Sequence, residues 1–293
     1  MEGRIWMKSN SKDKIIGYFL ITPFFFSFIL LVVYPLFEGI RIAFTYTTPS
    51  GEKVIGLQNF VKTLNHPEFR IAVYNTILFL AIAVNIKMAL ALFIANLLNK
   101  EFKGHRIIRG LILLPWALPA LTSLLSFKWM LEPTWGVVEY FITVLTGQKA
   151  LLLYHYNTAM AMIIIFHIWR NTPFWTLIFL SGLQSIPKSL YEAASIDGAD
   201  SVRLFRHITL PQIKYLYIVC LMLSFIWTAG EFNTVWILTG GGPAASTHLL
   251  ATLAYRFAFD IGDFGMSIST ILFALPIILL LAISLVRIIE KRG

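Results

Sequence analysis

Residues 71–98 read IAVYNTILFLAIAVNIKMALALFIANLL, an apolar stretch whose one charged side chain is Lys87. A helix needs about 20 mostly apolar residues to cross a bilayer, so this stretch is long enough to span one. Five more stretches meet the same criterion: Ile15 to Phe37, Ile107 to Leu131, Tyr156 to Leu180, Tyr215 to Leu238 and Ser267 to Ile289. The sequence therefore predicts an all-α, polytopic membrane protein with six transmembrane helices.

The composition of the 293-residue chain agrees with this prediction. Hydrophobic residues make up 57% of it and charged residues 13%, about half the charged fraction of an ordinary soluble protein. A soluble enzyme is excluded, and so is a disordered chain, because disordered chains are poor in apolar and aromatic residues. The first apolar stretch is longer than a signal-peptide core and ends in Tyr34-Pro35-Leu36-Phe37, without a small-residue cleavage site, so we expect it to be retained.

The net charge of +9 is explained by its distribution. An even number of spans places both termini on one side of the membrane, and most of the 24 Lys and Arg residues lie in segments on that side. The positive-inside rule then predicts that both termini are cytoplasmic. We divide the chain into a cytoplasmic N-terminal segment, residues 1–14, and a six-helix transmembrane domain, residues 15–293.

The sequence shows no equipment for chemistry of its own. It lacks the Walker A, HExxH and GxSxG patterns that mark nucleotide, zinc-protease and hydrolase sites. Its one cysteine, Cys220, lies in an apolar run, and five of the histidines stand apart from one another: His66, His105, His155, His207 and His248. The sequence therefore predicts neither a catalytic centre nor a metal site.

The segment from Ser181 to Lys214 is too long for a simple connection between two helices. Pro187 blocks continuation of the preceding helix. Ser189 and Glu192 have the spacing of a capping box, which predicts a short helix starting at Leu190.

A second short helix is predicted after a turn at Gly198, which can adopt the left-handed conformation that ends a helix. Asp200 or Ser201 can cap this helix, which runs to about His207, and Pro211 precedes the next span. Both short helices carry apolar faces. These faces either dock into a groove of a partner protein or pack on the helix ends of the chain itself, and the pattern leaves both readings open.

The run Glu192-Ala193-Ala194-Ser195-Ile196-Asp197-Gly198-Ala199, continued by Phe205, Ile208, Leu210 and Pro211, resembles the EAA loop of the membrane subunits of binding-protein-dependent ABC importers. The resemblance implies a coupling loop over about residues 182–213 that sits in a cleft of a cytoplasmic ATPase subunit. It assigns this contact to Glu192, Ala193, Ala194, Asp197, Gly198 and Ala199.

A second resemblance narrows the family. Leu238-Thr239-Gly240-Gly241-Gly242-Pro243, followed by Ser246-Thr247 and Tyr255-Arg256, together with Asn171-Thr172-Pro173-Phe174, is similar to the carbohydrate-uptake branch of these permeases, the maltose and glycerol-phosphate type. This implies a sugar or polyol substrate, phosphorylated or not, and a location in the cytoplasmic (inner) membrane. The implied partners are a second permease subunit, two ATPase subunits that bind ATP and Mg, and an extracytoplasmic substrate-binding protein. No cofactor is expected in this chain.

Ionisable side chains inside spans are costly and usually functional. On the fourth predicted span, His167, Arg170, Asn171 and Phe174 are spaced to share one helix face. Hydrogen-bonding groups beside an aromatic ring suit polyol recognition. On the fifth span, Trp227, Thr228 and Glu231 are spaced likewise. We expect both groups to line the solute pathway.

The alternative is a purely structural role, in which Arg170 and Glu231 pair with each other and the aromatic residues fill the bundle interior. Lys128 is expected to snorkel toward the outer surface, and the sequence names no partner for Lys87.

Two other classes of function are weighed. A self-contained, ion-coupled secondary transporter of a small polar solute would need ion-binding groups at discontinuous helices in inverted repeats, whereas Glu231 is the one acidic residue well inside a span and no inverted repeat is visible. A membrane-embedded enzyme would need a nucleophile and base on the spans, and the sequence offers neither. An ABC permease subunit without enzymatic activity is the leading interpretation.

Overall fold

The computed structural model describes residues 11–48, 51–100 and 103–290. The predicted N-terminal segment, residues 1–14, lies mostly outside the described residues, and its last four residues already belong to the first helix. The α-helices of the first half of the chain are α1 (Ser11–Phe28), α2 (Tyr34–Ala43), α3 (Gln58–Asn65), α4 (Pro67–Phe79), α5 (Asn85–Leu98), α6 (His105–Ile112), α7 (Leu114–Ala117), α8 (Ala120–Met130) and α9 (Val137–Thr146).

Those of the second half are α10 (Tyr156–Gln184), α11 (Lys188–Ile196), α12 (Ser201–Leu204), α13 (Leu210–Ala229), α14 (Asn233–Leu238), α15 (Leu250–Tyr255) and α16 (Phe264–Glu290). Four π-helical turns join or extend helices: η1 (Ile29–Val33), η2 (Leu80–Val84), η3 (Phe205–Thr209) and η4 (Arg256–Asp260). The chain is not purely helical as predicted, because β1 (Thr45–Thr48) and β2 (Gly51–Val54) form an antiparallel hairpin. In this hairpin Thr45 pairs with Val54.

Within the described ranges, five helical segments are long and apolar enough to cross a membrane. They are Ile16–Ala43, Pro67–Leu98, Tyr156–Gln184, Ser201–Ala229 and Phe264–Glu290. The π-turns η1, η2 and η3 continue the helical path inside three of them, so each of these counts as one span. The predicted class, a polytopic helical membrane protein, is therefore confirmed.

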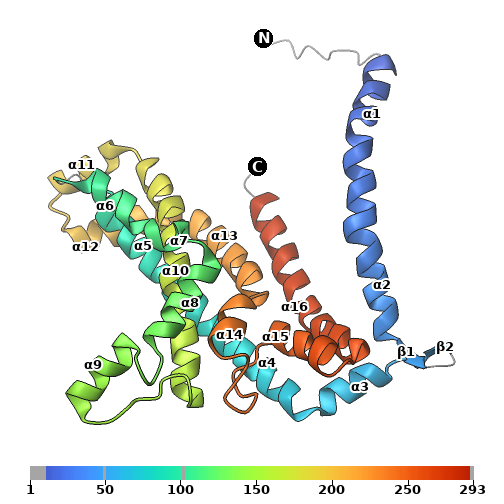
Figure 1. The fold of residues 1–293 in the computed structure, drawn as a ribbon. Coiled ribbons are helices and arrows are strands. Elements are labelled where there is room, and N and C mark those ends of the chain that lie inside the picture. The colour runs from blue at the N-terminus through green and yellow to red at the C-terminus, as the bar shows by residue number, and fades with distance from the viewer. Residues whose placement is uncertain (1–10, 49–50, 101–102, 291–293) are drawn as a thin grey trace.

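The remaining predicted span, Ile107 to Leu131, is interrupted and forms α6, α7 and α8 instead of one helix. The main break is at Leu118, whose backbone is extended (φ −67°, ψ 143°) immediately before Pro119. Proline disfavours the helical conformation of the residue before it and has no N–H to donate. The stretch runs through the molecule as three short helices (Figure 1), so the prediction of a single continuous span is wrong there.

The fifth predicted span also differs from expectation at both ends. Its helix begins at Ser201, because η3 continues α12 directly into α13 and Pro211 is accommodated at the start of α13. It ends at Ala229, and residues 230–232 separate α13 from the short α14. Glu231 therefore lies in a break between two helices and not, as predicted, on a helix face.

The short helices of the 182–213 segment are confirmed, with one correction. Helix α11 begins at Lys188 with Pro187 as its N-cap residue and without a side-chain cap, so the predicted capping box of Ser189 and Glu192 does not form. The Pro187 carbonyl accepts from the Leu190 amide (3.2 Å) and starts the first turn itself. Gly198 is left-handed (φ 79°), and Asp200 caps α12 by accepting from the Arg203 amide (2.8 Å), both as predicted.

The core is built where α5, α10 and α13 pack together (Figure 1). One apolar cluster, which includes Met88, Phe179 and Cys220, fills the half toward α11. A second cluster, which includes Phe79, Ile163 and Val235, fills the opposite half. Lys87, His167 and Thr228 are buried at the level between the two clusters.

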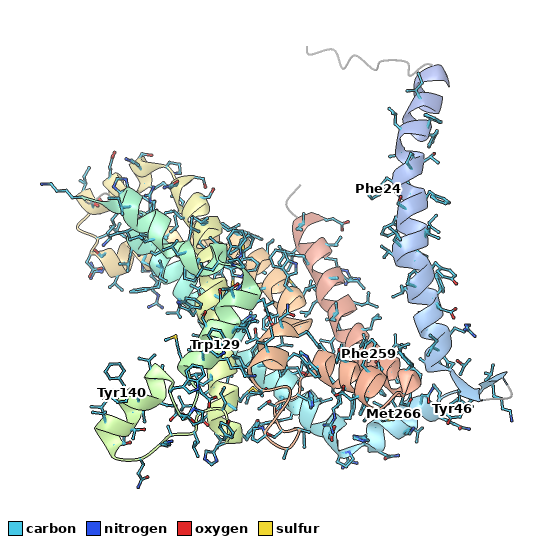
Figure 2. The ribbon with its side chains drawn as sticks, viewed as in Figure 1. Phe24, Tyr46, Trp129, Tyr140, Phe259 and Met266 are labelled. Atoms are coloured by element: carbon cyan, nitrogen blue, oxygen red, sulfur yellow. The ribbon has the colours of Figure 1, made fainter. Side chains whose placement is uncertain are left out.

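The first long helix stands apart from this bundle, as Figures 1 and 2 both show. Its apolar window is 0% buried inside the chain. Phe24 projects from it among side chains that meet no other described element (Figure 2), and its ring contacts are with Phe25 and Phe28 of the same helix. Only the α2 end reaches the bundle, where it packs against α16.

Candidate solute site and coupling loop

A hydrogen-bonded network of buried polar side chains occupies the level between the two apolar clusters. His167 of α10 is at its centre and is 3% exposed. Its Nδ1 lies 3.0 Å from Glu231 Oε2 and its Nε2 lies 3.2 Å from Lys87 Nζ. Lys87 also donates to Thr228 Oγ1 (3.2 Å). The network thus joins α5, α10 and the end of α13 to the break before α14.

This arrangement selects one tautomer of His167. A carboxylate can only accept and an ammonium can only donate, so Nδ1 carries the proton toward Glu231 and Nε2 accepts from Lys87. Asn171 donates through Nδ2 to the His167 carbonyl (2.9 Å), one turn away on α10. Its amide is thereby held beside the ring and at the edge of the network.

Glu231 has a second role at the helix break. Its Oε1 accepts from the Thr234 amide (3.0 Å) and from Thr234 Oγ1 (2.9 Å), in the first turn of α14. A carboxylate is favoured there because the first N–H groups of a helix lack partners within it. One side chain therefore fixes the start of α14 and balances the charge of Lys87 through His167.

An aromatic cluster adjoins the network. Phe174 of α10 contacts Trp227 of α13 (ring centroids 5.6 Å apart) and Trp116 of α7 (5.4 Å), and Trp175 also contacts Trp227 (5.5 Å). Trp227 is 60% exposed on the chain taken alone. The cluster therefore presents aromatic rings on an open face, one turn along α10 from Asn171.

Arg170 lies apart from the other predicted pathway residues. Its guanidinium lies 3.4 Å from the Leu118 carbonyl, at the break that Pro119 imposes between α7 and α8. Glu231 is paired with His167, so the alternative in which Arg170 and Glu231 pair with each other is wrong. The structure instead brings together His167, Asn171, Thr228 and Glu231 in the network, and Phe174 and Trp227 in the cluster.

Two features of the site were missed from sequence. Lys87, for which the sequence named no partner, is a full member of the network, and its position as the one charged residue of an apolar span was the available signal. Trp116 and Trp175 belong to the aromatic cluster but had no distinguishing pattern. Lys128 remains exposed as expected for a snorkelling side chain, and it donates to the Ile237 carbonyl at the end of α14 (2.8 Å).

The apolar side chains of the coupling-loop segment face two different directions. Phe205 and Ile208 pack against the core cluster of α5, α10 and α13, and Tyr191 Oη is hydrogen-bonded to Thr209 Oγ1 (2.9 Å). Ile196 and Val202 are 87% and 73% exposed, on either side of the turn at Gly198. The reading in which the short helices pack on the chain's own helices therefore holds for one face. The other face is uncovered in this chain, and its docking to a partner stays a prediction.

The glycine-rich segment after α14 is a compact loop. Gly241 is left-handed (φ 86°), and a Cβ there would overlap the ring of His248. Thr247 Oγ1 donates to the Gly242 carbonyl (2.5 Å), and Asn75 of α4 donates to the His248 carbonyl (3.0 Å). Burial lowers the pKa of His248 to about 4, so its ring is neutral at physiological pH and packs as an uncharged group.

Residues 87–292, which hold the whole polar network, the aromatic cluster and the coupling loop, match the family described as binding-protein-dependent transport system inner membrane component. The chain belongs to this family. The assignment confirms the resemblance seen in the EAA loop and in the Gly240–Pro243 segment, and it places this transport component in the inner membrane.

Curated relatives and a solved structure agree with the assignment. The trehalose/maltose transport system permease protein MalF of Thermococcus litoralis is 32% identical over 279 residues, which cover 94% of each chain. The sulfoquinovosyl glycerol transport system permease protein SmoG of Agrobacterium fabrum is 32% identical over 268 residues, 90% of this chain and 87% of that one. A chain of the bacterial alginate ABC transporter, solved with an alginate pentasaccharide-bound periplasmic protein, superposes with a TM-score of 0.82 at 19% identity over 97% of this chain and 96% of that one. At this identity the superposition confirms the fold of the transport component.

The network predicts that Lys87 is needed for the stability of this family member. Lys87→Met keeps the length of the side chain but leaves the Glu231 carboxylate with His167 as its remaining nearby basic group. Removing one member of a buried charge network costs about 3–5 kcal/mol, so we expect a clearly lowered midpoint of thermal denaturation in detergent.

The matched control is Lys128→Met, which removes an exposed lysine and one hydrogen bond, a loss of about 1 kcal/mol. Equal midpoints for the two variants would show that the network contributes nothing beyond an ordinary hydrogen bond.

Proposed function

We propose that this chain is one of two permease subunits of an ATP-driven ABC importer that carries a sugar or sugar-like polyol across the inner membrane. The observation that carries the proposal is the juxtaposition of the polar network and the aromatic cluster where α10 meets the end of α13, in a chain of this family. The names of the relatives, which specify trehalose/maltose and sulfoquinovosyl glycerol, support the substrate class.

The chemistry of the two groups fits a polyol. Sugar hydroxyls need directional partners and the apolar face of a sugar ring stacks on aromatic rings. Asn171 and the partly exposed edge of Glu231 supply hydrogen-bonding groups, and Phe174 and Trp227 supply the rings. His167, Thr228 and Lys87 are buried behind them and hold Glu231 in place. Arg170 is directed at the Leu118 carbonyl, so we assign it to the α7–α8 break and not to the solute.

The exposed position of Trp227 indicates that this chain supplies half of a pathway. A second permease subunit facing it would enclose a solute between the two chains. The first long helix, whose apolar window is 0% buried, also lacks cover within its own chain. Both surfaces support a heteromeric assembly in which neither permease chain transports alone.

The coupling loop is the proposed contact with the ATPase subunits, which bind ATP and Mg. Ile196 and Val202 present the apolar surface, and Glu192, Ala193, Ala194, Asp197, Gly198 and Ala199 form the surrounding helix and turn. The start of α1 and the end of α16 lie at the same end of the molecule as α11 (Figure 1), so we place both termini on the cytoplasmic side. The substrate-binding protein then docks at the opposite end, near α9 and the glycine-rich loop.

Co-purification tests the assembly. The full-length chain, tagged and purified from its native host in mild detergent, is expected to bring down a second six-span chain and an ATPase, and uptake in proteoliposomes is expected to require ATP and the binding protein. Uptake by the chain alone, driven by a proton or sodium gradient, would favour the secondary transporter and refute the importer.

The solute site is tested by Asn171→Ala and Trp227→Ala. Each removes one predicted solute contact and leaves the contacts of His167 with Lys87 and Glu231 in place, so we expect uptake to fall about tenfold, the effect of losing one good hydrogen bond or stacking contact. Assembly with the ATPase should be unchanged. Leu177→Ala, at an exposed position of α10, is the control and should transport normally. Wild-type uptake by both test variants would contradict the proposed solute site.

The coupling turn is tested by Gly198→Val. A β-branched residue at φ 79° is strained by about 1–3 kcal/mol, and the strain can be relieved only by moving α11 relative to α12. We expect ATP hydrolysis to continue while uptake per ATP falls. Gly262→Val is the matched control, because Gly262 has a similar φ of 80° with open space around it but lies between η4 and α16. If both variants behave alike, the effect is general strain and not coupling.

A further inference from the structure

A polar cavity of about 890 Å³ is lined by residues at the ends of α5 and α10 and by residues of α6 and α11. Helices α6 and α11 lie at the coupling-loop end of the molecule (Figure 1). It is separate from the network and the aromatic cluster. The side chains lining it share a basic or amide character: Lys100, Arg109, His105, Lys188, Asn99 and Gln184. The other lining residues are Leu183, Ile186 and Tyr191, so none of the described residues that line it is acidic.

Arg109 is the one arginine among the described residues that line this cavity. Its Nη2 donates to the Leu98 carbonyl at the end of α5 (2.8 Å), which fixes the guanidinium against the cavity wall. Its Nε is buried and has no hydrogen-bond partner in the described chain. The Nε is enclosed by the chain's own atoms, so the other guanidinium N–H groups of Arg109 are the donors available to an anion in the cavity.

The cavity lies at the ends of two helices that are long and apolar enough to cross a membrane. Helix α5 and helix α10 are spans, and the cavity opens where both end, at Leu98 and Gln184. Leu97 and Ile107 beside it are exposed apolar residues, 46% and 70%, as expected for a surface in contact with acyl chains. Lys100 is exposed at the rim. Basic pockets at this level between transmembrane helices are suited to phospholipid headgroups.

We propose that this cavity binds a phosphate group, with Arg109 and Lys100 as its principal charged partners. Arg and Lys donate charge-assisted hydrogen bonds to phosphate oxygens, and the amides of Asn99 and Gln184 provide further donors. The headgroup of an anionic phospholipid and free inorganic phosphate share this chemistry. A headgroup here would contact both α5 and the start of α11, and so would connect the lipid surface to the coupling loop.

The test measures binding to the full-length chain purified in a neutral detergent. Phosphatidylglycerol, phosphatidylcholine and inorganic phosphate are titrated separately, and bound lipid is counted by native mass spectrometry. We expect the wild-type chain to bind phosphatidylglycerol more tightly than phosphatidylcholine. Lys100→Gln should weaken this binding about tenfold, as the loss of one charge-assisted hydrogen bond predicts, and Arg109→Gln should weaken it at least as much.

Lys214→Gln is the matched control, because Lys214 is an exposed lysine at the same end of the molecule but outside the cavity. It should leave binding unchanged. Inorganic phosphate that binds with the same dependence on Lys100 and displaces the lipid identifies a site open to free phosphate, whereas binding of phosphatidylglycerol alone identifies a headgroup site. Equal losses in Lys100→Gln and Lys214→Gln, or lipid and phosphate binding that are both insensitive to Lys100, overturn the proposal. Lys100 is exposed, so the Lys100→Gln variant is expected to fold. It keeps the test decisive if the Arg109→Gln variant fails to fold.

Discussion

The cost of holding ions in an apolar bundle governs how the centre of this protein is built. Lys87 and Glu231 come from segments far apart in the chain, and each would be expensive to bury alone. His167 between them lets one ring accept from the ammonium and donate to the carboxylate. Glu231 also accepts a hydrogen bond from the first turn of α14. The contacts of Glu231 therefore fix where the chain turns between α13 and α14.

At two helix ends beside the site, a basic side chain hydrogen-bonds to a backbone carbonyl. The break at Leu118 frees a carbonyl that Arg170 approaches, and the end of α14 offers the Ile237 carbonyl to Lys128. Irregular backbone at membrane depth is tolerated where protein groups satisfy it. The basic side chains inside the apolar stretches thus have two uses, which are to balance a carboxylate at the centre and to satisfy backbone carbonyls at the breaks.

Much of this structure was predictable from the sequence, and the failures have physical causes. Apolar length identified the spans, and local signals identified the turn at Gly198 and the cap at Asp200, because these depend on neighbouring residues only. Prolines were ambiguous: Pro173 and Pro276 lie inside long helices, whereas Pro119 follows a break, and packing decides between these outcomes. Helical spacing grouped His167, Asn171 and Phe174 correctly, but the partner of Arg170 depended on a carbonyl in another segment. The partners of Lys87 were likewise beyond reach, since they lie on α10 and α13.

The isolated first helix has a consequence for how the complex is made. In water, an apolar helix without cover would drive aggregation, but in a bilayer the lipid tails are as apolar as its side chains. In the heteromeric assembly proposed above, lipid would therefore cover this helix after the chain is inserted, until the second permease subunit binds. Pairing must then be selected by the fit of one helix surface to another, because the hydrophobic effect gives no preference between lipid and protein at this surface. Correct subunit choice during biogenesis is thus a matter of shape.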